Sequence, residues 1–284
     1  MKTRILVKNI LSLMLLLSLL LSIMPCGFAD EAADEIFASG LQLFLGGETE
    51  EDSVKGYFLI REAAEAGSAD AILYIGYLIC GSGLGPAIYE DYTEGNDQEY
   101  GIRWLTECAE RGYQDAAANA FFEIGRSYLI GNEEVNIDEN MIYAIQFFDK
   151  ASELGMPKAK DLLGTFYTFG AGVAQDPDKA LTLFVEAARN GYDDALLNLE
   201  EYAYDYYSGA EDLIDINYGT CFKYYEALTE FGNTRAMYNL GQLYLFGLGV
   251  SRDQDKAIEW FTKAAEAGDS HAKDMLAQLS QNQK

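Results

Sequence analysis

Apolar residues recur along this chain with the period of an amphipathic helix. Between 257 and 265 they fall at positions i, i+1, i+3, i+4, i+7 and i+8, which places them on one face of a helix. Gly268 follows where a helix commonly ends, and the segment 234–246 has the same period and ends at Gly247. The pattern therefore predicts two helices joined by a short turn, which is a helical hairpin.

The turn of this hairpin is repeated earlier in the chain. FGLGVSRDQDKA at 246–257 and FGAGVAQDPDKA at 169–180 share the pattern F-G-x-G-V-x-x-D-x-D-K-A. Both follow A-x-x-x-L-G-x-x-Y and precede an apolar helix that ends A-A-x-x-G, so the unit has roughly 36 residues. A repeat of this length indicates a supersecondary unit rather than an isolated site.

A glycine that closes the second helix sets the phase of six units. A small residue lies eleven positions before it, and a large apolar residue, which we expect to fill the groove between helices, lies eight before. The predicted units are approximately 33–67, 68–112, 113–155, 156–191, 192–232 and 233–268, with a capping helix in 269–284. The glycines are Gly67, Gly112, Gly155, Gly191, Gly232 and Gly268; the small residues are Gly56, Gly101, Ala144, Ala180, Cys221 and Ala257; the large residues are Leu59, Trp104, Phe147, Leu183, Tyr224 and Trp260.

These units predict an all-α fold. One hairpin cannot bury its apolar face alone, so six in series are expected to stack into an α/α solenoid, or superhelix, that forms a single domain over 30–284. The turn itself does not predict a phosphate site, because a P-loop needs Gly-Lys-Ser/Thr after its glycines. We interpret Gly247 and Gly249 as turn residues, and Asp176 and Asp253 as N-caps of the next helix.

The repeated elements resemble those of the Sel-one-like repeat (SLR) family, a relative of the tetratricopeptide repeats. The resemblance rests on A-x-x-x-L-G-x-x-Y, G-x-G-V, D-x-x-K-A and K-A-A-x-x-G, most completely from Ala236 to Gly268, and by phase it runs from about Ala33. The fifth unit departs from the pattern, since Glu200 replaces the glycine of the first helix. The resemblance implies a solenoid that acts as an adaptor for other proteins and has no chemistry of its own.

The N-terminus has the features of an export signal. Basic residues precede an uncharged apolar run at 10–24, and the small residues Gly27 and Ala29 follow it. We predict a signal peptide over 1–29, cleaved after Ala29, and a protein exported to the periplasm, cell envelope or extracellular space. The alternative is an uncleaved segment that anchors the chain in the membrane.

Charge and composition limit the function further. The chain has 46 acidic and 20 basic side chains, which disfavours nucleic-acid binding. The acidity either keeps the protein soluble and weakly associating, or it selects a basic protein or peptide partner or binds cations loosely. Cys80, Cys108 and Cys221 are odd in number beyond the signal, so a disulfide framework is not expected, and His271 is the chain's single histidine. No motif for a catalytic nucleophile, metal or cofactor is present, and we expect no enzyme activity.

Two stretches interrupt the repeat and carry the candidate partner contacts. Gly81 to Gly101 and Glu201 to Gly219 are rich in tyrosine and acid, and long loops on a rigid scaffold often bind partners. Either stretch could equally be an extension of its hairpin without a binding role. The candidate contacts are Tyr89, Asp91, Tyr92, Tyr204, Asp205, Tyr206 and Tyr207.

Three functional hypotheses follow. The preferred one is an exported scaffold that binds a protein or peptide on the solenoid surface. The alternatives are a cell-envelope enzyme or inhibitor that acts on cell-wall material, and a protein that binds calcium weakly at acidic turns such as Asn136 to Asn140. That turn lacks the glycine and the final glutamate of an EF-hand loop.

Overall fold

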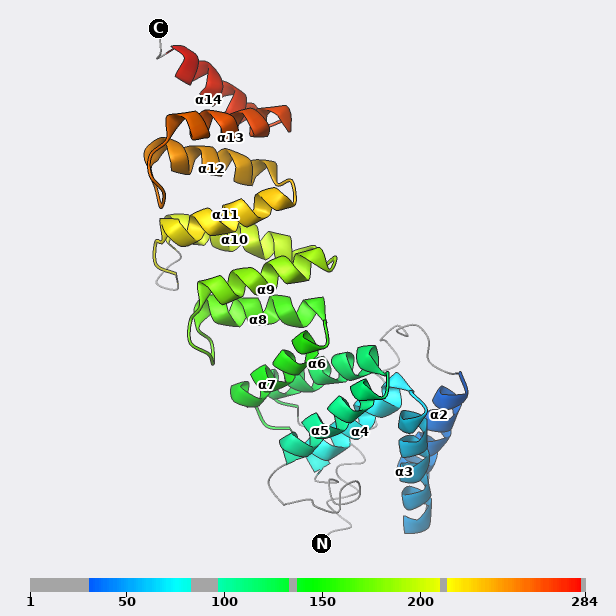
Figure 1. The fold of residues 1–284 in the computed structure, drawn as a ribbon. Coiled ribbons are helices and arrows are strands. Elements are labelled where there is room, and N and C mark those ends of the chain that lie inside the picture. The colour runs from blue at the N-terminus through cyan, green and yellow to red at the C-terminus, as the bar shows by residue number, and fades with distance from the viewer. Residues whose placement is uncertain (1–30, 83–96, 133–136, 210–213, 282–284) are drawn as a thin grey trace. The chain divides into compact units, whose positions relative to one another are not determined.

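The described part of the chain is helical. A computed structural model describes residues 31–82, 97–132, 137–209 and 214–281. In these ranges the only β-structure is an isolated bridge between Asn132 and Ile137, so the predicted all-α class is confirmed. The helices are α2 (Glu31–Gly46), α3 (Glu50–Glu65), α4 (Ala69–Ser82), α5 (Asp97–Glu110), α6 (Gln114–Ile130), α7 (Met141–Glu153), α8 (Pro157–Phe169), α9 (Pro177–Arg189), α10 (Asp194–Ser208), α11 (Tyr218–Glu230), α12 (Thr234–Phe246), α13 (Gln254–Glu266) and α14 (Ser270–Gln281) (Figure 1).

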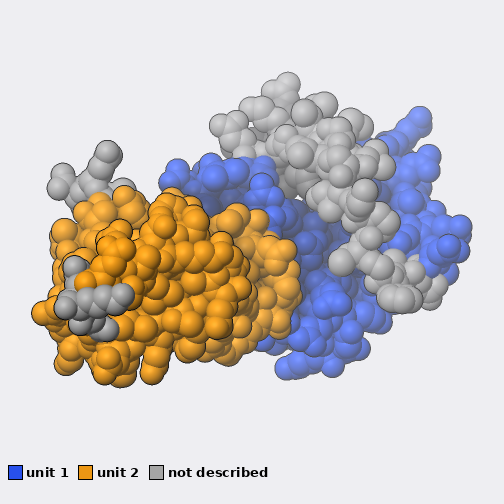
Figure 2. Space-filling view, turned by 90° about the horizontal axis from the view of Figure 1, so that it is seen from above, with its two compact units in different colours: residues 1–159 blue, residues 160–284 orange. Residues whose placement is uncertain are grey.

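Each predicted repeat contains two of these helices. The six pairs run from α2 with α3 to α12 with α13, and α14 follows as the expected additional helix. Contacts divide the chain into two compact units, residues 1–159 and residues 160–284 (Figure 2). The first unit contains α2 to α7 and the start of α8, and the second contains the rest of α8 and α9 to α14. The single domain expected over 30–284 stays a prediction.

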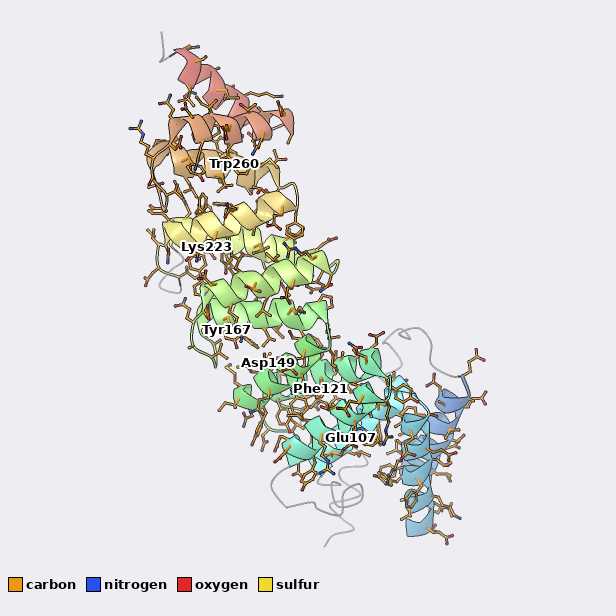
Figure 3. The ribbon with its side chains drawn as sticks, viewed as in Figure 1. Glu107, Phe121, Asp149, Tyr167, Lys223 and Trp260 are labelled. Carbon is orange, nitrogen blue, oxygen red and sulfur yellow. The ribbon has the colours of Figure 1, made fainter. Side chains whose placement is uncertain are left out.

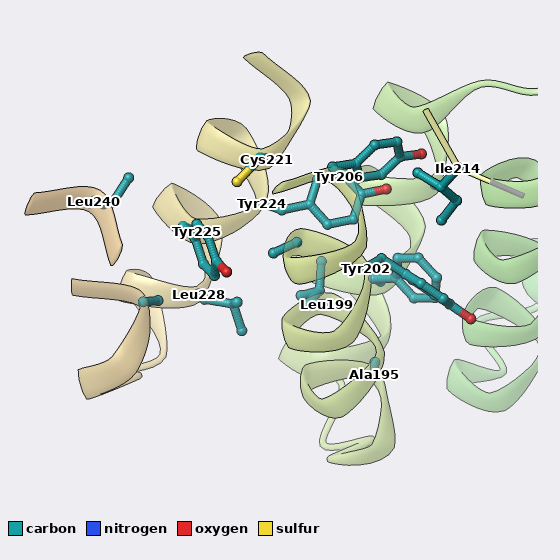
Figure 4. Packing of buried hydrophobic residues seen from close by; sticks show 14 of the residues in the cluster. Ala195, Leu199, Tyr202, Tyr206, Ile214, Cys221, Tyr224, Tyr225, Leu228 and Leu240 are labelled. Carbon is teal, nitrogen blue, oxygen red and sulfur yellow. The ribbon is translucent and has the colours of Figure 1, made fainter. Parts of the chain in front are cut away.

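The core of the second unit is continuous from one hairpin to the next. One buried cluster joins residues of α9, α10, α11 and α12, several of them aromatic (Figure 4). The ring of Tyr206 in α10 packs edge-on against Tyr224 in α11, with ring centroids 5.4 Å apart. The Tyr224 hydroxyl donates to the carbonyl oxygen of Pro177 over 3.0 Å, which ties α11 to the start of α9. Successive hairpins of this unit therefore share a core, as a solenoid requires.

The turn between the two helices of a hairpin has the structural role that its sequence predicts. Gly247 adopts a left-handed backbone with φ of +70°, a conformation that is strained for other residues. The side chain of Asp253 accepts hydrogen bonds from the backbone N–H groups of Asp255 (3.1 Å) and Lys256 (3.0 Å). In the earlier copy, Asp176 accepts from the N–H of Lys179 over 2.9 Å. The glycines and aspartates therefore shape the turn and start the next helix.

The predicted small positions are confirmed, but only three of the predicted large residues, Trp104, Phe147 and Tyr224, are buried. Leu59, Leu183 and Trp260 are only half-buried, and Trp260 packs against the core cluster of the second unit. The residue that follows the predicted large one is buried in every unit, because one step along a helix turns a side chain by about 100°. These buried residues are Ile60, Leu105, Phe148, Phe184, Tyr225 and Phe261.

A glycine in the first helix of the hairpin receives the buried ring from the second. A Cβ atom added to Gly164 would lie 2.7 Å from Cε1 of Phe184, and one added to Gly241 would lie 2.6 Å from Cε1 of Phe261. Both distances are far shorter than a van der Waals contact, so the glycine is required sterically. This contact explains the glycine of the A-x-x-x-L-G-x-x-Y element.

The interpretation of 201–219 as a loop is wrong over its first part. Residues 201–208 form the last two turns of α10, which makes α10 longer than α8 and α12. Ile214 is buried after this helix, and Asn217 caps α11 by accepting from the N–H of Thr220 over 3.1 Å. The fifth unit therefore adds helix rather than an extended binding loop.

Candidate partner-binding surface

The candidate contacts fall into two groups with different outcomes. Tyr89, Asp91 and Tyr92 lie outside the described residues. Tyr204, Asp205, Tyr206 and Tyr207 all lie in the final turns of α10. Consecutive residues of a helix point in different directions, so these four side chains cannot share one surface.

The structure separates the four α10 candidates by burial. Tyr204 is 60% exposed, and Asp205 beside it is half-buried. Tyr206 is only 2% exposed and belongs to the core, so its prediction as a contact is wrong. Tyr207 is half-buried and packs edge-on against Tyr218, with ring centroids 5.6 Å apart. Tyr204 is therefore the most open of the four candidates, and Asp205 lies beside it partly exposed.

Sequence reasoning missed the other residues of that surface. Leu197 is 66% exposed, and Glu201 is exposed between Leu197 and Tyr204. Spacings of four and three residues place these three side chains on one side of the helix. The period was visible in the sequence, but the exposure of Leu197 was not. We call the following set the α10 face: Asp194, Leu197, Asn198, Glu201, Tyr204 and Asp205.

Two neighbouring helices border the α10 face. On one side, Nδ2 of Asn198 donates to Oδ1 of Asp161 in α8 over 2.8 Å. On the other side, Glu200 accepts from Arg235 Nη1 (2.8 Å) and from Asn233 Nδ2 (3.0 Å), both near the start of α12. Glu200 occupies the position where other units have glycine. Its side chain connects the fifth and sixth units through these bonds, whereas the glycine leaves room for an aromatic ring. The borders of the face are therefore fixed by polar contacts between helices.

The carboxylates on and beside the α10 face repel one another. Burial, and then the charge of Glu201, raises the pKa of Asp205. Burial also raises the pKa of Asp161, to which Asp194 adds while the bond from Asn198 opposes the shift. Among the described residues, no lysine or arginine forms an ion pair with Asp194, Glu201 or Asp205. The face thus carries negative charge that no described lysine or arginine pairs with.

Besides the pair of Glu200 with Arg235, two ion pairs of the second unit join α9 and α11. Lys223 of α11 (Figure 3) reaches Oδ1 of Asp178 in α9 over 2.6 Å. Arg189 of α9 reaches Oε2 of Glu230 in α11, also over 2.6 Å. These pairs connect the second helices of consecutive hairpins, whereas α10 is a first helix. Exposed pairs of this kind contribute little to stability, typically below about 1 kcal/mol each.

The described residues do not assemble a metal centre. No three His, Cys, Asp or Glu side chains in the described ranges come close enough to hold a metal ion. Burial raises the pKa of the thiols of Cys108 and Cys221 to about 12, which disfavours the reactive thiolate, and Cys80 is shifted in the same direction. In the turn considered for calcium, Asn140 instead caps α7 by accepting from the N–H of Tyr143 over 3.1 Å. Asn136 lies outside the described residues.

None of the described helices combines the length and the apolar character needed to cross a bilayer. The predicted signal segment lies outside the described residues.

Comparisons with known proteins agree with the repeat phase. The model of the Sel1 repeat family matches residues 37–68, 119–156, 157–192 and 234–269, which together make half of the chain. Residues 69–118 and 193–233 lie outside these matches. They contain nearly all of the second and fifth predicted units, where the sequence departs most from the repeat.

The chain is also similar to curated proteins and to a solved structure. The chain is 29% identical over 181 residues to the chitin synthase regulator SKT5 of Saccharomyces cerevisiae, covering 63% of this chain and 25% of that one. It is 33% identical over 254 residues to the human protein sel-1 homolog 2, covering 84% of this chain and 33% of that one. A crystal structure of a Sel1 repeat protein from Oxalobacter formigenes has 25% identity and a TM-score of 0.36, covering 85% of this chain and 86% of that chain. The chain thus spans about a quarter to a third of the length of these two curated relatives.

Proposed function

Because the chain belongs to the Sel1 repeat family, we propose that it is an exported scaffold that binds a protein or peptide partner on its helical repeats and catalyses no reaction. The observation that carries this proposal is an exposed surface without a catalytic arrangement. Stacked hairpins bury one another's apolar faces and form a rigid outer surface. On that surface, Leu197 and Tyr204 remain open to solvent although they are large. Large exposed side chains beside polar ones are typical of interaction sites.

The relatives support a non-catalytic role. The yeast relative is named as a regulator of chitin synthase rather than as the synthase itself. We extend to this chain the coarse property only, which is action through binding. Neither chitin nor a synthase is assigned as its target, since the match covers 25% of that relative.

Capture of the partner tests the proposed function. The full-length chain would be crosslinked in the cells that produce it, and captured proteins would be identified by mass spectrometry. We expect one protein to be recovered repeatedly and then to bind the purified chain in a direct titration. An unrelated acidic protein of similar size, exported by the same route, is the control for charge. If the chain recovers nothing beyond this control, the scaffold function is contradicted.

Export is a separate part of the proposal. It rests on the basic, apolar and small-residue pattern of residues 1–29. Sequencing the N-terminus of the protein from the exported fraction should give a mature chain that begins at Asp30. A chain retained inside the cell with Met1 in place would contradict export, and an exported chain that keeps residues 1–29 would support the anchor alternative.

Catalysis on cell-wall material remains the competing function, and no observation on the described residues favours it. Incubation of the purified chain with cell-wall fragments is expected to leave them unchanged by mass spectrometry. Reproducible cleavage or transfer would contradict the scaffold assignment.

A further inference from the structure

We propose that the α10 face binds a basic peptide segment of the partner, in which apolar side chains lie beside lysine or arginine. The inference rests on the proposed function, because it assumes that the chain binds a protein at all. It adds the location of the binding surface and the chemistry of the ligand. Both follow from how α10 differs from α8 and α12, the corresponding helices of the neighbouring units.

The first difference is that Leu197 is not covered. The repeat phase aligns it with Asp161 in α8 and Tyr238 in α12. Asp161 is buried and bonded to Asn198 of the next hairpin. Tyr238 packs on the ring of Phe261 at 5.5 Å and on His271 of α14 at 6.1 Å. A later helix therefore covers the equivalent residue in both neighbouring units, but Leu197 stays open.

The second feature is the spacing of the two exposed apolar side chains of the α10 face, Leu197 and Tyr204. Leu197 and Tyr204 are seven residues apart, which corresponds to two helical turns and a rise of about 10 Å. Both are more than half exposed. A peptide with apolar side chains at a matching spacing could contact both at once, and burial of each would contribute favourably.

The third feature is the negative charge around Leu197 and Tyr204. Asp194, Glu201 and Asp205 follow the same side of α10 over about 16 Å, and the described chain supplies no cation to pair with them. The nearby Glu200 is already paired with Arg235. Lysine or arginine from a partner would lower the mutual repulsion of these carboxylates. Apolar side chains of a peptide would also cover Leu197 and Tyr204, which a simple cation cannot do.

The ligand chemistry can be tested directly with synthetic peptides. The probe is an alanine-rich helical peptide with two leucines seven residues apart and lysines on the adjacent side. A scrambled peptide of the same composition controls for net charge. We expect the full chain to bind the probe more tightly than the scrambled peptide by isothermal titration calorimetry, with weaker binding at higher salt.

Matched variants of the chain test the location. Glu201→Gln with Asp205→Asn should weaken binding of the probe about ten-fold, and Leu197→Ala with Tyr204→Ala should weaken it by a similar factor. Glu226→Gln with Glu259→Gln removes the same charge from exposed positions of α11 and α13, and it should leave binding unchanged. Circular dichroism would verify that all variants remain folded. Equal binding of the two peptides, or equal losses from both pairs of charge variants, would overturn the proposal.

The result is independent of the test of the proposed function. A chain that captures a partner in cells, while its α10 variants bind the probe like the wild type, overturns the α10 assignment and leaves the scaffold function intact. A chain that captures no partner in cells contradicts the scaffold function whatever the peptides do. Capture that is lost in the Glu201→Gln, Asp205→Asn variant and kept in the Glu226→Gln, Glu259→Gln variant supports both.

Discussion

Gly241 lets the two helices of the last hairpin pack at the distance set by an aromatic ring. Its missing side chain leaves room for Phe261, which is fully buried. Gly164 and Phe184 repeat the arrangement two units earlier. The sequence shows these glycines as part of a repeated pattern, but the ring that each one receives is identified only by packing.

Substitution of this glycine should therefore be costly. Gly241→Ala places a methyl group 2.6 Å from Cε1 of Phe261, and the resulting shift should reduce the free energy of unfolding by roughly 1–3 kcal/mol. Chemical denaturation followed by circular dichroism measures the change. Gly219→Ala is the matched control, since its new Cβ would meet nothing closer than Oδ1 of Asn217 at 3.4 Å. Equal stability of the two variants would show that the ring contact is not tight.

The buried carboxylate of Asp161 should make the stability of the protein depend on pH. Its pKa is raised in the folded chain, first by burial, so the folded state binds a proton more readily than the unfolded state. The stability contributed by this group therefore falls as pH rises from the unfolded pKa through the raised folded pKa. Asp161→Asn removes the titration while its amide oxygen can still accept from Asn198.

The comparison is made at two pH values. Asp161→Asn should gain stability relative to the wild type between pH 4 and pH 7, by urea titration at each pH. Asp253→Asn is a suitable control, because this aspartate is an N-cap and its replacement keeps a capping oxygen. A stability difference between Asp161→Asn and the wild type that does not change with pH would contradict the raised pKa.

At the scale of the element, α10 combines two departures from the repeat. It is longer than its neighbours, and it carries Glu200 where they carry glycine. The carboxylate of Glu200 holds Asn233, whose own side chain caps α12 by accepting from the N–H of Ala236 over 2.9 Å. A residue that looked like a defect in the sequence therefore supports the start of the next helix.

Loss of this carboxylate should weaken the junction of the fifth and sixth units. Glu200→Ala is expected to lower the free energy of unfolding by roughly 0.5–1.5 kcal/mol, because the bonds to Asn233 and Arg235 disappear. Its sequence neighbour provides the control: Glu201→Ala removes an exposed carboxylate without a bonded partner and should change stability by less than about 0.5 kcal/mol. If both substitutions have the same effect, the bonds of Glu200 contribute nothing measurable.

At the scale of the whole molecule, the repeats interact mainly with their neighbours along the chain. Stability of such a protein is approximately a sum of terms for each repeat and for each junction. The second compact unit has its own buried clusters and the terminal helix α14, whose Leu276 and Leu279 pack against the last cluster. It therefore has the features of a fragment that folds independently.

A fragment of residues 157–284, which keeps α8 whole, should be helical and should unfold in one cooperative transition. Circular dichroism during heating measures both properties. A fragment that begins at residue 178 breaks the hairpin of α8 and α9, and it should be less stable because the apolar face of α9 loses α8. An unfolded 157–284 fragment would contradict the independence of this unit.

The sequence alone determined the helices, their pairing in hairpins and the glycine and aspartate turns. These features depend on local periodicity and local capping, and the segment 234–246 was predicted with the bounds that α12 has. The sequence could not determine which large residue points inward, because neighbouring positions such as Trp260 and Phe261 are both apolar. It also placed 201–208 in a loop, since tyrosine and acid are common in loops and do not exclude a helix.

Only tertiary packing decided which residues of α10 are available to a partner. Tyr204 and Tyr206 have the same chemistry in the sequence, yet one is open and the other is in the core, because a helix turns by about 200° between them. Leu197 had no sequence signal for exposure, since its openness depends on the absence of a covering helix that Asp161 and Tyr238 both have. Local pattern therefore fixes the elements of this protein, and contacts between hairpins fix its surface.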